Sequence, residues 1–172
     1  MSGRFEYAGR TALITGAASG IGAALAADLA GRGAHLILVD INADGLEAIA
    51  QPLRADGRLV STYVVDMADA AAIRQLARDV EAAGEPVHLL INNAGIALGG
   101  LFEQVEQADF ERLIDINLHG VIRMTRAFLP QLRAVEEAHI VNISSIFGIV
   151  APAGQAAYSA AKFGVRGFSN AL

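Results

Sequence analysis

The feature that most constrains the fold is a fivefold alternation of short apolar runs with longer helical stretches. The apolar runs are continuous rather than alternating, which is typical of strands buried on both faces in a parallel sheet. We therefore predict an α/β fold, a doubly wound parallel sheet with helices on both faces and right-handed crossovers. The predicted strands cover residues 10–15, 35–40, 59–65, 87–91 and 139–143. The predicted helices cover residues 21–32, 42–55 or 44–55, 69–83, 107–133 and 156–172. The fourth of these helices is expected to bend near residues 117–120 or at Pro130.

The length of 172 residues suits one domain, and without repeats or linkers we expect a single domain over residues 1–172. Apolar residues make up 53% of the chain, yet no run approaches the ~18–20 uncharged residues of a membrane span. The amino terminus has no apolar core of signal-peptide type. Cysteine is absent, which excludes disulfides and thiol nucleophiles and fits a reducing cytoplasm. The net charge of −5 argues against a nucleic-acid partner.

The chain has four histidines, and none of them stands at metal-ligand spacing from another. We interpret them as structural or solvated side chains, since no metal motif is present. The sequence therefore predicts no metal site; the histidines are His35, His88, His119 and His139.

A glycine-rich turn, Thr-Gly-Ala-Ala-Ser-Gly-Ile-Gly over residues 15–22, joins the first predicted strand to the first predicted helix. Gly16 permits the tight turn, and Gly20 and Gly22 let the backbone approach a phosphate and the helix pack close to the strand. The helix start, with Ser19 and Ile21, then offers free N–H groups to a pyrophosphate. A glycine cluster alone is equally compatible with a simple tight turn, but the strand before it and the helix after it favour a phosphate site.

Asp40 ends the second predicted strand, 18 residues after Gly22. That spacing is close to the ~20 residues expected of an acid that bonds an adenosine ribose hydroxyl. Its carboxylate would repel a 2′-phosphate, and neither Ile41 after it nor Ser19 before Gly20 is basic. We therefore expect NAD(H) in preference to NADP(H). The alternative is an acid that only caps a strand end or helix.

Lys162 is the only lysine among the 13 basic residues, and Tyr158 precedes it by four positions. The two side chains share one face of a predicted helix. An ammonium beside a phenol favours the phenolate form, and arginine is not an equivalent substitute. The pair therefore indicates a general acid/base, with a surface lysine beside a packed tyrosine as the alternative.

Taken together, these motifs resemble the short-chain dehydrogenases/reductases, the short type with Thr-Gly-x-x-x-Gly-x-Gly and Tyr-x-x-x-Lys. The likeness runs from residue 10 to 172 and implies a Rossmann-like fold with the family's strand order 3-2-1-4-5-6-7. Only five of these strands are expected in this chain, so the fifth strand would lie at an edge. It also rests on four further places, which are Asp66-Met67, Asn92-Asn93-Ala94-Gly95, Asn117, and Asn142-Ile143-Ser144-Ser145, whose second serine lies 13 residues before Tyr158.

The resemblance implies an oxidoreductase that transfers a hydride between NAD(H) and an alcohol or ketone. It implies that Tyr158 is the acid/base, that Ser145 orients the substrate oxygen and that Lys162 also bonds the nicotinamide ribose. Asn117 is then a proton relay, although it could instead only bend its helix. It further implies that Asp66 bonds the adenine amine. The remaining expected cofactor contacts are Gly16, Ser19, Gly20, Ile21, Gly22, Asp40, Met67, Asn93, Ala94, Gly95 and Tyr158.

The loop over residues 146–155 is apolar except for Gln155, which favours a small apolar alcohol or ketone as substrate. Family members continue for two more strands and a segment over the nicotinamide, so we expect this chain to be C-terminally incomplete, with weakened NAD(H) binding and little turnover. The family also implies a homodimer or homotetramer. Two alternatives stay open, namely a non-catalytic nucleotide-binding protein on the same fold and a methyltransferase-like Rossmann domain.

Overall fold

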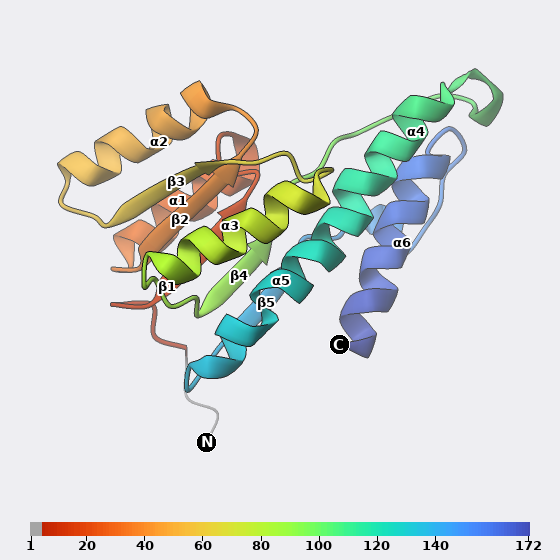
Figure 1. Cartoon of the computed structure of the whole chain (residues 1–172). Helices are drawn as coiled ribbons and strands as arrows, with labels where there is room; N and C mark the ends of the chain where they lie inside the picture. The colour runs from red at the N-terminus through yellow and green to blue at the C-terminus, as the bar shows by residue number, and fades with distance from the viewer. Residues whose placement is uncertain (1–4) are drawn as a thin grey trace.

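The structure, a computed structural model, describes residues 5–172 and contains one five-stranded parallel sheet (Figure 1). The strand order is β3-β2-β1-β4-β5, which confirms the predicted Rossmann-like α/β fold. The register pairs Thr11 with His35 and Leu13 with Leu90, so β1 lies at the centre. The strands are β1 (Thr11–Thr15), β2 (His35–Asp40), β3 (Val60–Val64), β4 (Leu89–Asn92) and β5 (His139–Asn142).

Helices cover both faces of the sheet because neighbouring residues on a strand point to opposite sides. Leu13 packs with residues of α3 and α5, whereas Ile14 packs with residues of α1 and α2. The last helix, α6, lies beside α4 in Figure 1, and the two share a small apolar cluster. The helices are α1 (Gly20–Gly31), α2 (Ala43–Ala55), α3 (Ala70–Ala82), α4 (Gln107–Ile114), α5 (Val121–Ala134) and α6 (Ala156–Ala171).

Local signals placed most boundaries correctly. Asp69 caps α3 by accepting from two backbone N–H groups, and Asn42 rather than Asp44 caps α2. The predicted long helix is interrupted by a π-helical segment, η2 (Asp115–Gly120), at the first of the two expected positions, while α5 continues through Pro130.

Burial on both faces was predicted for all five strands and is wrong for two of them. β3 is only half-buried, and exposed and half-buried residues alternate along β5. Both lie at the edges of the sheet, where one side has no neighbouring strand in the described residues. Two short turns were not predicted, η1 (Phe102–Gln104) and η3 (Ile146–Gly148). Within residues 5–172, none of the helices has the length and apolar character needed to span a bilayer.

Candidate functional site

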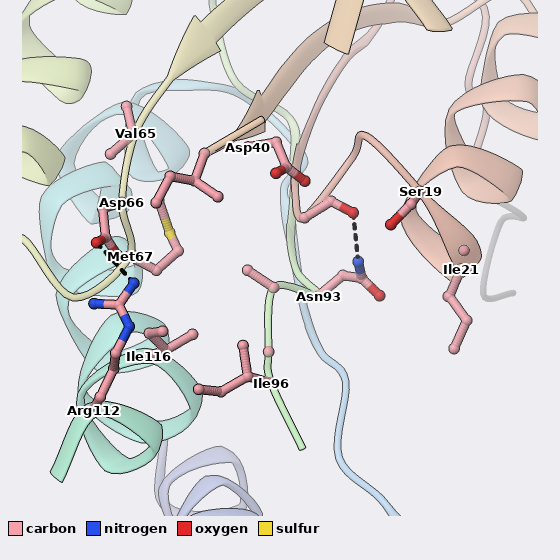
Figure 2. A pocket seen from close by; sticks show the side chains of 15 residues that line it. Ser19, Ile21, Asp40, Val65, Asp66, Met67, Asn93, Ile96, Arg112 and Ile116 are labelled. Atoms are coloured by element: carbon pink, nitrogen blue, oxygen red, sulfur yellow. Dashed lines mark hydrogen bonds and ion pairs between the residues drawn. The ribbon is translucent and has the colours of Figure 1, made fainter. Parts of the chain in front are cut away.

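A cleft of about 420 Å³ opens at the carboxyl ends of the central strands (Figure 2). Ligands of open α/β sheets bind at this edge, and the volume lies within the ~300–1,000 Å³ range of small-molecule sites. It brings together residues that are far apart in the sequence, and it is lined by Gly16, Ser19, Gly20, Ile21, Asp40, Ile41, Val65, Asp66, Met67, Asn93, Ala94, Gly95, Ile96, Arg112 and Ile116.

The glycine-rich turn is locked to the loop that follows β4. Asn93 Nδ2 donates to the carbonyls of Thr15 and Gly16 at 3.0 and 3.1 Å, and Figure 2 draws one of these two bonds. In return, Thr15 Oγ1 accepts from the backbone N–H groups of Asn93 and Ala94. Gly16 has φ +66°, and a Cβ on Gly22 would lie only 2.0 Å from the Gly16 carbonyl oxygen. Gly22 therefore lies beneath the turn and does not line the cleft.

The start of α1 is open to an anionic ligand. Ser19 is its N-cap residue, but its side chain makes no capping hydrogen bond, so the first-turn N–H groups lack a side-chain acceptor. Ser19, Gly20 and Ile21 are all exposed at the cleft. Free N–H groups and the helix dipole suit a phosphate group. The turn therefore fits a pyrophosphate.

Asp40 lies at the rim of the cleft, and backbone N–H groups fix its carboxylate. Oδ2 accepts from Ala18 of the glycine-rich turn and Oδ1 accepts from Asn42, both at 3.0 Å. Asp40 thus bonds backbone N–H groups at the end of its strand, as the alternative interpretation expected, and it also faces the cleft. Each carboxylate oxygen keeps a further lone pair for a ligand hydroxyl.

Asp66 and Met67 form another wall of the cleft (Figure 2). Asp66 Oδ1 accepts from the Ala68 N–H at 2.9 Å, and Oδ2 pairs with Arg112 at 3.1 Å. Met67 is buried, as is Ile116 from η2. Among residues 5–172, Arg112 is the one basic side chain in the lining, and it lies at Asp66, not Asp40.

Tyr158 and Lys162 lie on α6, outside the lining of this cleft. Lys162 is only 4% exposed, and its Nζ donates to the Ile143 carbonyl at 2.8 Å and lies 5.6 Å from the centre of the Tyr158 ring. Burial lowers the pKa of the Lys162 ammonium because it removes the charge from water. The structure thus brings the pair together at the end of β5.

Ser145 and the η3 turn lie against the same helix. Ser145 Oγ accepts from the Phe147 N–H, and the Phe147 ring meets the Tyr158 ring edge to face at 6.0 Å. A Cβ on Gly148 would come within 2.9 Å of the Lys162 carbonyl oxygen, so η3 packs directly on the helix. Phe147 therefore contacts both Ser145 and the Tyr158 ring.

Asn117 is fully buried in η2 and contacts the loop after β4 rather than Lys162. Its Oδ1 accepts from the Ile96 N–H and its Nδ2 donates to the Ile96 carbonyl, both at 2.8 Å. No hydrogen bond joins it to Lys162 among the described residues. The structure thus shows that Asn117 pins this loop, and its predicted relay role stays a prediction.

Comparison with known proteins shows the family. A model described as short chain dehydrogenase matches residues 10–172. The chain belongs to the short-chain dehydrogenase family. This result excludes the methyltransferase-like alternative, which shares only the general fold.

Two relatives and two solved structures illustrate the likeness. The Mycobacterium tuberculosis protein SadH is 46% identical over 167 residues, 97% of this chain and 60% of SadH. D-threitol dehydrogenase of Mycolicibacterium smegmatis is 39% identical over 168 residues, 98% of this chain and 65% of the relative. A Burkholderia phymatum short-chain dehydrogenase/reductase in complex with NAD has TM-score 0.93 and 37% identity, over 98% of this chain and 60% of that one. A metagenomic short-chain oxidoreductase in complex with NADP has TM-score 0.91 and 34% identity, over 97% and 76%.

Sequence reasoning missed several residues of the cleft. Val65, Arg112 and Ile116 line it from just after β3, from α4 and from η2. Arg112 gives no local signal because its partner Asp66 lies 46 residues away in sequence. Tertiary packing alone brings these side chains to the cleft.

Proposed function

We propose that this chain carries the NAD(H)-binding part and the proton-transfer group of an oxidoreductase that acts on an alcohol or ketone. The observation that carries the proposal is the Lys162 ammonium, buried beside the Tyr158 ring and bonded to the Ile143 carbonyl. A buried cation is costly, and such groups concentrate at functional sites. Membership of the short-chain dehydrogenase family supports the same activity.

The cleft fits NAD(H) better than NADP(H). We assign the adenosine ribose to Asp40, the adenine to Asp66 and the pyrophosphate to the start of α1. The Asp40 carboxylate would repel a 2′-phosphate. Among the described residues, the only basic side chain of the lining is Arg112, which pairs with Asp66. Relatives have been solved with NAD and with NADP, so the preference rests on Asp40. When bound, NAD would supply the hydride acceptor.

The side chains of α6 and the β5 loop would then move the proton. Tyr158 as phenolate accepts the hydroxyl proton of the alcohol while the carbinol carbon loses its hydride, and as phenol it returns a proton to a ketone oxygen. Ser145 Oγ already accepts from Phe147, so its own hydrogen is available for the substrate oxygen. Lys162 has two N–H donors beyond its bond to Ile143, which suit a ribose hydroxyl.

The substrate we propose is a small, largely apolar alcohol or ketone. Ile146, Ile149 and Val150 expose apolar side chains in and after η3, directly beyond Ser145. Ile96 adds an exposed side chain at the cleft. We further propose a homodimer or homotetramer, as the family resemblance implied, in the reducing cytoplasm that the absence of cysteine fits.

Nucleotide binding and turnover test the proposal separately. NADH should bind more tightly than NADPH, and the opposite order would refute the argument from Asp40. With NAD and a panel of apolar alcohols, Tyr158→Phe should abolish the little turnover that we expect of this chain, while Tyr63→Phe, a change of the same chemistry on β3, should leave it unchanged. Equal, measurable rates in both variants would refute the mechanism. NADH binding without turnover in the unaltered chain would favour the non-catalytic alternative.

A further inference from the structure

Arg112 is the one charged residue of the cleft that the proposed function leaves without a task. It comes from α4, and its Nη2 lies 3.1 Å from Oδ2 of Asp66, on the side of the cleft opposite Ser19 (Figure 2). Its side chain is 48% exposed, so it pairs with Asp66 while still facing the open cleft. A purely structural ion pair of this exposure would contribute little to stability.

The pair has a fixed geometry. The Ala68 N–H holds Oδ1 of Asp66 at 2.9 Å, and Arg112 holds Oδ2. Arg112 itself stands on a rigid element, because the next residue, Leu113, is fully buried in a cluster with residues of α6. These contacts hold the carboxylate and the guanidinium side by side at the cleft wall.

The pair therefore presents acceptors and donors side by side at one cleft wall. The carboxylate has lone pairs beyond its two bonds, and the guanidinium has five N–H donors, of which Asp66 takes one. Adenine shows the complementary pattern, an amino donor next to a ring-nitrogen acceptor. Hypoxanthine carries an oxygen in place of that amino group and a hydrogen on the ring nitrogen, so in the same orientation it would set an acceptor against the carboxylate and a donor against the guanidinium.

We infer that Arg112 is a specificity-determining residue, which acts with Asp66 to select a 6-amino purine at this end of the cleft. The inference rests on the proposed function, since it assigns the base of the dinucleotide to this wall. Arg112 contributes a donor to the ring nitrogen and holds the carboxylate toward the amino group. Removing it weakens adenine binding more than hypoxanthine binding.

Calorimetry on the whole chain tests this with two probes, NADH and reduced nicotinamide hypoxanthine dinucleotide. The unaltered chain should prefer NADH, and Arg112→Gln should reduce that preference about tenfold, since one charge-assisted hydrogen bond is lost. Arg112→Lys keeps the charge but not the planar fork and should retain part of the preference. Arg32→Gln is the matched control, because Arg32 makes a similar exposed pair with Asp28 on α1.

The outcomes separate the two claims. An unchanged NADH preference in Arg112→Gln and Arg112→Lys, with both variants folded by circular dichroism, overturns the inference and leaves the proposed function standing. Failure of the unaltered chain to bind either dinucleotide overturns the proposed function and the inference with it. An equal loss of preference in Arg32→Gln also overturns the inference, because Arg32 lies outside the cleft.

Discussion

Replacing Gly22 with alanine should damage the cofactor turn far more than the same change elsewhere in α1. The added Cβ would lie 2.0 Å from the Gly16 carbonyl oxygen and 2.8 Å from Asn93 Nδ2. Contacts under 3.0 Å are essentially never seen for Cβ atoms, so the turn and the helix must separate by about 1 Å. The groups that must move are backbone and a side chain bonded to it, which cannot simply rotate away.

The expected cost follows from three contributions. Overpacking costs about 1–3 kcal/mol. Weakening the bonds from Asn93 to the Thr15 and Gly16 carbonyls adds about 1 kcal/mol. The higher helix propensity of alanine returns up to about 1 kcal/mol. We therefore expect Gly22→Ala to lower the free energy of unfolding by about 2–3 kcal/mol, which lowers Tm by roughly 5–10 °C for a domain of this size.

Urea unfolding followed by far-ultraviolet circular dichroism measures this loss, since the chain has no tryptophan. Gly31→Ala is the matched control, because its Cβ would enter open space in the same helix and alanine should be neutral or slightly stabilising. Gly20→Ala also meets nothing, but its φ of +53° should cost about 1–2 kcal/mol. If Gly22→Ala proved as stable as Gly31→Ala, the close approach of turn and helix would be refuted.

Three further changes test other contacts. Thr15→Val should cost about 2–4 kcal/mol, because it removes the hydroxyl that accepts two backbone N–H groups, whereas Thr15→Ser should restore much of the loss on urea unfolding. Burial lowers the pKa of His88 below its ordinary 6.5, so the unfolded chain takes up the proton first and stability should fall as the pH drops below about 6.5. His88→Asn keeps an acceptor for the Thr11 N–H and should lose less stability between pH 7.5 and 5.5; an equal loss would contradict the assignment. Lys162→Met should abolish turnover yet change the free energy of unfolding by less than about 1 kcal/mol. The reason is that it replaces a buried cation whose one hydrogen bond among the described residues is to Ile143. A large loss of stability would mean that the ammonium is mainly structural.

The sequence predicted those elements whose signals are local. Both ends of β2 were predicted at the correct residue, because a continuous apolar run lies between Gly33 and the terminal acid, Asp40. The cap of α3 at Asp69 is a side-chain preference that needs no tertiary context. The π-helical segment η2 was predicted only as a bend, because helical periodicity continues on both sides of it and hides the extra residue.

The candidate site was predictable where chain order alone brings residues to one sheet edge. The loops after β1 and β4 must meet there because these strands pair directly. The contact between Asp66 and Arg112 was not predictable, because it depends on how far α4 reaches across the cleft. The engagement of Asn117 with Ile96 was missed for a similar reason, since only the π-helical segment turns its amide toward that loop.

The geometry of α6 explains why its one buried cation is a lysine. Three successive residues at the end of β5 bond to this helix: Asn142 donates to Ser169 Oγ, the Ile143 carbonyl accepts from Lys162 Nζ, and Ser144 Oγ donates to the Lys162 carbonyl. These bonds fix the height of the helix above the sheet. A compact ammonium on a flexible stem needs partners for three donors, whereas the planar guanidinium of arginine would need partners for five. Lys162 is thus held beside the Tyr158 ring by contacts within the protein, which is the preorganised arrangement that the proposed proton transfer requires.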